Sequence, residues 1–174
     1  MLIEKYEYLA ASTDTSSKKT IGQGESSVLG KLQPGDMVLV KKGSFLYGDH
    51  KAELNIPYDY WIDAFPVTNR QYQEFLQDTD YHKDRKPEVP FMDKDSISPY
   101  TWNKETSQCP KGREDHPVVW VSFEDAEKFC DGRSHKEGKS IRLPTEEEWE
   151  KAARGKDGRE YPWGDEFDAK LCNT

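Results

Sequence analysis

Three cysteine thiols are the side chains of this sequence best suited to bind a soft metal or to react as nucleophiles. Cys109, Cys130 and Cys172 stand at long spacings, and no Cys-x-x-Cys pair occurs. Thiolates bind soft metals such as Cu(I), for which two cysteines placed for linear coordination are the chemical minimum. The four histidines do not cluster into a zinc pattern. We therefore interpret the cysteines as free, partly buried thiols and not as a disulfide framework.

A second group with possible chemistry is a set of carboxylates close to the C-terminal end of the sequence. Asp165, Glu166 and Asp168 follow Pro162-Trp163-Gly164, which predicts a turn around a buried aromatic ring. Carboxylate oxygens in a turn suit calcium, but this spacing matches no EF-hand loop. A solvated acidic loop is the favoured interpretation, and a calcium site is the alternative.

The composition is that of a folded, polar domain. The 174 residues are 34% apolar, 33% charged and 12% aromatic, with a net charge of −8. That length suits one domain with a tail, and so many aromatic residues argue against wholesale disorder. The net charge disfavours binding to nucleic acid or to an anionic membrane. Without a long apolar run or a signal-peptide stretch, the sequence predicts a cytoplasmic protein.

Three short helices are expected to position these groups, and each begins with a capping box. The paired capping residues are Thr68 with Gln71, Ser122 with Asp125, and Thr145 with Glu148. Helical spacing predicts three inward faces: Tyr72, Phe75 and Leu76; Ala126, Phe129 and Cys130; Trp149, Ala152 and Ala153. The second helix is expected to end at Gly132 and the third at Gly155. Arg142, before the third helix, either orients a carboxylate such as Glu148 or Glu150 or is solvated.

The remaining sequence predicts short strands joined by long irregular segments. Residues 37–45 predict a strand ending at Gly43, residues 59–69 a second extended segment, and residues 118–121 a third strand. Residues 1–35 have the composition of a flexible tail or linker, so order is expected to begin at Asp36. The segment 78–115 predicts a long loop whose aromatic residues pack partly against the core.

Five motifs in a fixed order give the sequence a specific resemblance. They are Met37-Val-x-Val-x-x-Gly-x-Phe, Val67-Thr-Asn-x-x-Tyr-x-x-Phe75, His116-Pro-Val-x-x-Val-Ser-x-x-Asp-Ala126 with Phe129-Cys130, Arg142-Leu-Pro-Thr-Glu-x-Glu-Trp-Glu150 with Ala153-Arg154-Gly155, and Pro162-Trp163-Gly164. This series resembles the formylglycine-generating enzyme family, also called the sulfatase-modifying-factor domain, over most of residues 36–174.

The resemblance implies both a fold and a chemistry. The implied fold is α+β and C-type-lectin-like, loop-rich, with short capped helices and small sheets. Active relatives oxidise a cysteine of a sulfatase peptide to formylglycine, using molecular oxygen, a copper ion held by two active-site cysteines, and structural calcium. A sulfatase-type peptide or another protein is therefore an expected partner.

The sequence departs from the family pattern at its C-terminal end. Members continue past Thr174, and the two copper-binding cysteines lie in that further part, so none of the three cysteines here inherits their role. Asn173 matches a calcium-binding position, to which the carbonyl of Thr174 would add, which predicts only a partial calcium site. Cys130 matches a cysteine that some secreted members cross-link, and here we expect a free core thiol. The domain over 36–174 is thus expected to be truncated, to lack catalytic residues and to be inactive alone.

Two other functions remain open. One is a non-catalytic, C-type-lectin-like ligand- or protein-binding module that uses the loop at residues 78–115 as its surface. The other is an iron-dependent sulfoxide synthase, whose His-x-x-x-His-x-Glu site none of the four histidines forms; His116 is expected to pack in the core.

A truncated domain would also leave apolar surface exposed. We expect Trp149, Phe129 and residues 118–121 to be exposed, and therefore expect either a chain or domain that completes the fold or poor solubility.

Overall fold

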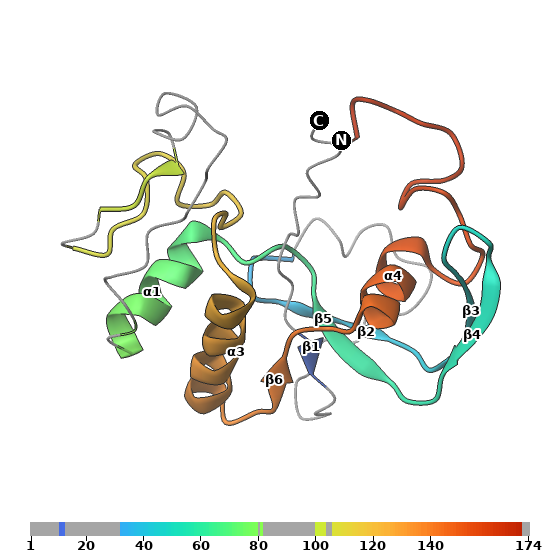
Figure 1. The fold of residues 1–174 in the computed structure, drawn as a ribbon, viewed down its shortest axis with the longest axis horizontal. Helices are drawn as coiled ribbons and strands as arrows, with labels where there is room; N and C mark the ends of the chain where they lie inside the picture. The colour runs from blue at the N-terminus through green and yellow to red at the C-terminus, as the bar shows by residue number, and fades with distance from the viewer. Residues whose placement is uncertain (1–10, 13–31, 80, 82–99, 104–105, 172–174) are drawn as a thin grey trace.

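The computed structural model describes residues 11–12, 32–79, 81, 100–103 and 106–171. In these residues the chain forms two antiparallel sheets and three helices, an α+β fold (Figure 1). The elements are β1 (Ala11–Ser12), β2 (Met37–Val40), β3 (Gly43–Tyr47), β4 (Ala52–Ile56), β5 (Tyr60–Asp63), α1 (Asn69–Thr79), α3 (Phe123–Glu137), β6 (Ile141–Arg142) and α4 (Glu146–Arg154).

The larger sheet has the strand order β2-β5-β1-β6, and β5 is buried along its whole length. Successive side chains of a strand point to opposite faces, so β5 serves two cores. Tyr60 and Ile62 pack with Phe45 of the β3–β4 hairpin, whereas Trp61 packs with Cys130 of α3. The sheet therefore separates α3 on one side from the hairpin and α4 on the other (Figure 1).

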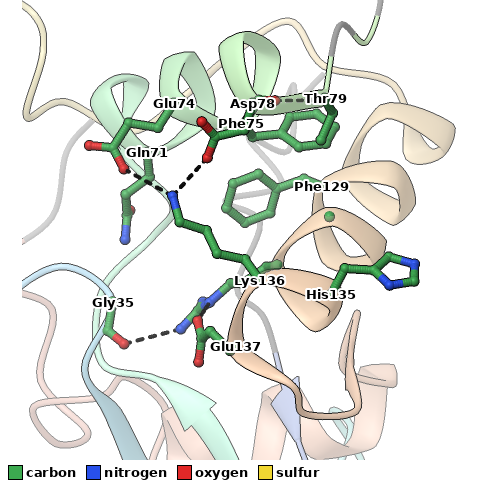
Figure 2. A pocket seen from close by; sticks show the side chains of 12 residues that line it. Gly35, Gln71, Glu74, Phe75, Asp78, Thr79, Phe129, His135, Lys136 and Glu137 are labelled. Atoms are coloured by element: carbon green, nitrogen blue, oxygen red, sulfur yellow. Dashed lines mark hydrogen bonds and ion pairs between the residues drawn. The ribbon is translucent and has the colours of Figure 1, made fainter.

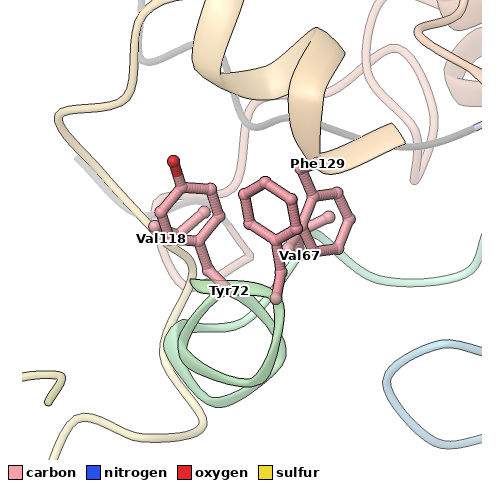
Figure 3. Packing of buried hydrophobic residues seen from close by; sticks show 5 residues of the cluster. Val67, Tyr72, Val118 and Phe129 are labelled. Atoms are coloured by element: carbon pink, nitrogen blue, oxygen red, sulfur yellow. The ribbon is translucent and has the colours of Figure 1, made fainter. Parts of the chain in front are cut away.

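A third core cluster joins α1 and α3 at the other end of the molecule. Tyr72 and Phe75 of α1 contact Phe129 of α3, with ring centroids 5.9 and 5.6 Å from it. Val67 and Val118 complete the buried cluster (Figure 3). The inward faces predicted for the first two helices are confirmed: Tyr72 and Phe75 of α1 and Ala126, Phe129 and Cys130 of α3 are buried, as their helical spacing predicts.

All three predicted capping boxes are present. The Ser122 side chain accepts from the Asp125 amide, and the Asp125 carboxylate accepts from the Ser122 amide; Thr145 and Glu148 pair in the same way. The Gln71 side chain accepts from the Thr68 amide at 2.9 Å. Helix starts are readable from sequence because these bonds join residues only three positions apart.

The predicted end of the second helix at Gly132 is wrong. α3 continues to Glu137 and is capped by Gly138 in the left-handed region, at φ 65°. Gly132 instead lies where α3 packs closely against α1: a Cβ there would lie 2.7 Å from the ring of Phe75. The glycine is needed for packing and does not stop the helix.

The predicted inward face of the third helix is also wrong. Trp149 is 46% exposed and Ala152 is exposed, whereas Glu148 and Lys151 are 0% and 2% exposed. Both charged side chains find polar partners inside the molecule, described below. Those partners decide which face of α4 is buried, so apolar spacing gives the wrong face.

The predicted strands differ from those of the structure. Residues 37–45 form two strands interrupted at residues 41–42, and β1, β4 and β6 were not predicted. Residues 118–121 form no strand: the Val118 amide donates to the Val67 carbonyl at 2.8 Å, but Trp120 has a φ of 63°, which breaks an extended run. His116 is exposed and not in the core.

Ordered contacts occur before Asp36, where order was expected to begin. β1 lies between β5 and β6 in the sheet, pairing Ala11 with Ile62 and with Arg142, and Leu32 is buried. The other residues before Leu32 lie outside the described residues, so the division into 1–35 and 36–174 stays a prediction. In the segment 78–115, Tyr81 and Trp102 pack against the third cluster as expected, whereas Phe91 lies outside the described residues.

Candidate functional site

The Cys130 thiol lies in the core beneath the sheet. It is 3% exposed and packs with Met37, Trp61 and Ile141. Burial, followed by the negative charge of Asp63, raises the pKa of Cys130 to about 12. The expected free core thiol is confirmed, and at neutral pH it stays protonated.

The Cys109 thiol is free and half-buried in the loop that follows α1. Its backbone amide donates to the side chain of Gln73 at 2.8 Å. Burial, followed by the charge of Glu114, raises the pKa of Cys109 above its ordinary value. The residues that pack around Cys130 do not include Cys109, so these two thiols do not form the pair that a linear copper site needs. Cys172 lies outside the described residues.

The acidic turn near the C-terminal end is a set of local hydrogen bonds. Asp165 accepts from the Glu160 amide and Asp168 from the Lys170 amide, both at 2.9 Å. All three carboxylates of the turn are exposed, and no group of three or more His, Cys, Asp or Glu that could hold a metal occurs within the described residues. Asn173 and Thr174, the predicted partial calcium site, lie outside those residues.

Glu148 is the centre of a polar network at the start of α4. Its carboxylate is fully buried and accepts two hydrogen bonds from the Arg142 guanidinium, at 2.6 and 2.7 Å. Tyr58 donates to the same carboxylate at 3.0 Å, and the Tyr60 hydroxyl donates to the Glu148 carbonyl. Of the two roles left open for Arg142, orienting a carboxylate is the correct one, and that carboxylate is Glu148.

The Glu148 carboxylate is ionised despite its burial. Burial alone would raise its pKa, but the hydrogen bonds from Arg142 and from the Thr145 amide outweigh that effect and lower the pKa of Glu148. Every lone-pair direction of the carboxylate is occupied by a donor from the protein. The carboxylate therefore has a positional role: it ties Arg142 of β6 and Tyr58, just before β5, to the start of α4, and it has no lone pair left for a substrate.

Lys151 is a second buried charge on α4. Its ammonium group donates to the Gly43 carbonyl at 2.7 Å and lies 5.8 Å from the centre of the Phe45 ring. Burial, followed by the positive charge of Lys156, lowers the pKa of Lys151. The lysine attaches α4 to the β3–β4 hairpin, one turn along from the Glu148 network.

On the opposite side of the sheet, Arg133 of α3 contacts β5. Its guanidinium donates to both carboxylate oxygens of Asp63, at 2.8 and 2.9 Å, and to the Gly35 carbonyl at 3.1 Å. Arg133 also pairs with Glu137. Burial would lower the pKa of Arg133, but Asp63 and Glu137 together raise it.

The sequence prediction missed Lys151, Asp63 and Arg133 as buried charges. A signal existed for Arg133, which follows Phe129 and Cys130 at helical spacing on the inward face of α3. Lys151 likewise follows Glu148 by three residues on α4. No such signal existed for Asp63, since a carboxylate at the end of a strand is most often solvated.

Several large apolar side chains are exposed at the surface. Trp149 of α4 and Phe123, the first residue of α3, are 46% and 63% exposed, and Trp120 is 36% exposed. The expectation of exposed apolar surface is confirmed for Trp149 and Trp120 but is wrong for Val118 and Phe129, which are 4% and 6% exposed. In the part of the chain that the structure describes, no helix is both long and apolar enough to cross a membrane.

The chain is similar in sequence to several known proteins. The family model of the sulfatase-modifying factor enzyme 1-like domain matches residues 23–174. The chain is 38% identical over 139 residues to the bovine "Inactive C-alpha-formylglycine-generating enzyme 2", covering 64% of this chain and 44% of the relative. It is 33% identical to the mouse protein of the same name, covering 83% and 56% of the two chains. It is 35% identical to the "Formylglycine-generating enzyme" of Thermomonospora curvata, covering 62% and 42%. The chain thus spans about half the length of these relatives.

Proposed function

We propose that this chain, which belongs to the family of the sulfatase-modifying factor enzyme 1-like domain, supplies the scaffold of such a domain and does not by itself oxidise a peptide cysteine. The observation that carries the proposal is the placement of its thiols. Cys130 is 3% exposed in the core, and the residues that pack around it do not include Cys109, which lies in the loop after α1 with its amide bonded to Gln73. A copper ion held by two cysteines needs two thiols that reach it together, and these two do not form such a pair.

Two features of the chain support a scaffolding role. The first is that its buried charges are fully engaged within the fold, as the Glu148 network illustrates. The second is its similarity to two relatives whose names call them inactive, beside one named as a formylglycine-generating enzyme. Scaffold and active centre can diverge separately within a family, because the fold is held by groups other than those that react.

The alternative of a lectin-like binding module receives less support. It relies on the aromatic residues of the segment 78–115 to form a ligand-binding surface. Tyr81 and Trp102 instead pack inward against the third core cluster, and Tyr100 is covered by the guanidinium of Arg113 at 4.5 Å. These three rings already contact other parts of the protein, so they do not form an open surface for a ligand.

The proposal is tested by assaying the chain with a cysteine-containing sulfatase peptide, copper and oxygen, and by following the peptide with mass spectrometry. We expect no conversion under conditions in which the Thermomonospora curvata relative converts the peptide. Turnover by this chain would overturn the proposal. In that event, loss of turnover in Cys109→Ser would identify the reacting thiol.

Several finer expectations accompany the proposal and stay predictions. They are the C-type-lectin-like form of the fold, calcium held in part by Asn173 and Thr174, copper as the cofactor of active family members, a completing chain or domain, and a cytoplasmic location. A sulfatase-type peptide is the partner that the family name suggests.

A further inference from the structure

The strand β1 occupies a slot in the middle of the larger sheet, between β5 and β6 (Figure 1). It runs antiparallel to both neighbours, and the paired positions are Ala11 with Ile62 and Arg142, and Ser12 with Trp61 and Ile141. The slot therefore consists of two strand edges that face each other across a third strand. Strand edges of this kind bind extended peptides by adding them to the sheet.

The strand β1 fills this slot only in part. β2 pairs with all four residues of β5, Tyr60–Asp63, whereas β1 pairs with two of them, Trp61 and Ile62. Two residues supply few hydrogen bonds to a sheet, and alanine is depleted in strands. β1 is therefore a short occupant, which a longer strand can replace.

The side chain of Trp61 has an unsatisfied donor next to β1. It is 5% exposed, and its indole nitrogen Nε1 has no hydrogen-bond partner within the described residues. The buried side chains that pack with it, those of Met37, Cys130 and Ile141, contain no oxygen. A buried N–H group without an acceptor costs free energy and is rare in folded proteins. The unpaired indole is a second, independent indication that the slot suits another occupant.

The register of the sheet shows which residue of an occupant would stand beside Trp61. Ser12 lies directly opposite Trp61. Directly opposite residues of two antiparallel strands share a face of the sheet, with Cβ atoms about 4.5 to 5.5 Å apart. A side chain of the length of asparagine or glutamine, placed at this position, could offer its oxygen to Nε1. A carboxamide suits this buried position better than a carboxylate, because burying a charge costs more free energy.

The pocket between α1 and α3 contains no buried group of this kind among its described residues. Lys136 reaches Asp78 at 2.8 Å there (Figure 2). Phe75 and Phe129 of its lining are 8% and 6% exposed. Within the described residues, Nε1 of Trp61 is the one buried side-chain nitrogen or oxygen without a partner. The slot in the sheet, and not this pocket, therefore contains a group that still needs an acceptor.

We propose that the slot between β5 and β6 binds an extended peptide segment of a partner protein, which replaces β1 and places an asparagine or glutamine opposite Trp61. The backbone of this segment would pair with β5 and β6 as that of β1 does, and its carboxamide oxygen would accept from Nε1. β1 then acts as an internal competitor that covers the two strand edges. The proposal stands whether or not the chain oxidises a peptide cysteine, because it uses only the slot and the Trp61 indole.

The test is the binding of a fluorescein-labelled peptide with the sequence of residues 6–17 to the full chain, measured by fluorescence anisotropy. The variant Ala11→Pro should release β1, because proline cannot donate a hydrogen bond within a central strand. We expect this variant to bind the peptide on the order of tenfold more tightly than the wild type, whose own β1 competes at a high effective concentration. The same peptide with Ala11→Pro is the matched control and should bind neither protein.

A second peptide, with Ser12→Gln, tests the acceptor. We expect it to bind the Ala11→Pro chain about two- to tenfold more tightly than the unchanged peptide, which is the effect of one added hydrogen bond. The indole N–H resonance of Trp61 should move further downfield with the glutamine peptide than with the unchanged one. In the double variant with Trp61→Phe, which keeps an aromatic ring and removes the donor, the two peptides should bind equally.

Three results would overturn the proposal. The first is that neither the unchanged nor the glutamine peptide binds the Ala11→Pro chain. The second is that the proline peptide binds as tightly as the unchanged one, which would show that no strand is added. The third is equal affinity of the unchanged and glutamine peptides while Trp61 is intact. If Ala11→Pro or Trp61→Phe is misfolded by circular dichroism, the three peptides are compared on the wild type and the Trp61 indole resonance decides.

Discussion

At the scale of single residues, buried pairs of opposite charge determine how the helices pack on the sheet. Arg133 and Asp63 are 10% and 2% exposed, and Glu148 is wholly buried beneath Arg142. A buried ion pair adds little net stability compared with apolar residues, but removing one member leaves an uncompensated charge in the interior. These pairs therefore specify how the helices sit on the sheet.

Replacing Arg133 tests this directly. Arg133→Met leaves the Asp63 carboxylate buried without its cation and should lower the free energy of unfolding by about 3 to 5 kcal/mol. Arg70→Met is the control, because Arg70 and Asp115 form a pair with side chains 54% and 75% exposed. That change should cost less than about 1 kcal/mol. Urea unfolding of both variants provides the measurement, and equal losses would contradict the assignment.

The Cys130 thiol gives a second prediction at this scale. Burial raises its pKa to about 12, so the folded state keeps a proton that the unfolded chain releases near pH 9. The resulting stabilisation is complete below pH about 9 and is lost as the pH rises toward 12, at up to about 1.4 kcal/mol per pH unit. In the Cys130→Ala variant, the fall in the free energy of unfolding at alkaline pH should lack this contribution.

Urea unfolding at several values between pH 8 and about 11 gives the free energy of unfolding of both proteins at each pH. The slopes of this free energy against pH are then compared. The alanine variant is expected to be less stable at pH 8 because it loses packing, but its curve should fall less steeply above pH 9. Parallel curves would show that the thiol ionises equally in both states.

At the scale of elements, each helix is defined locally at its start and tertiary contacts decide how it packs. The capping boxes at Ser122 and Thr145 depend only on neighbours along the chain. The crossing of α1 and α3 depends instead on Gly132, which meets the ring of Phe75. The glycine therefore sets the distance between two helices that share a core.

Gly132→Ala separates helix propensity from packing. Alanine in the middle of a helix is favoured over glycine by about 1 kcal/mol. Here its Cβ would lie 2.7 Å from Phe75, so overpacking should reverse the sign and destabilise the protein by about 1 to 3 kcal/mol. Pairing the change with Phe75→Leu should restore part of the loss. A more stable single variant would mean that α1 shifts freely.

At the scale of the whole molecule, the described residues leave large apolar side chains at the surface. Trp149 and Phe123 stand at the N-terminal parts of α4 and α3, and Phe167 lies in the C-terminal loop, 61% exposed. Large exposed apolar side chains such as these are candidates for contact with another chain or domain. The completing chain or domain predicted above would cover such surface.

Self-association is the measurable consequence. The double variant Trp149→Glu with Phe123→Glu should shift the chain toward the monomer in size-exclusion chromatography with light scattering, at concentrations where the wild type associates. Asn55→Glu, at an exposed position of β4, is the control for added negative charge and should leave the association unchanged. A wild-type chain that is monomeric at all concentrations would contradict this prediction.

The sequence by itself determined the helix starts, the inward faces of α1 and α3, and membership of a family with short capped helices. These features follow from hydrogen bonds and apolar spacing within a few residues of the chain. Only the tertiary structure decided that α4 buries Glu148 and Lys151 instead of Trp149, that Gly132 packs instead of ending a helix, and that Cys130 stays protonated. In each case at least one partner lies far away in the chain: Tyr58 is 90 residues from Glu148, and Gly43 is 108 residues from Lys151. Burying a charge depends on such a partner, and spacing along one helix contains no information about it.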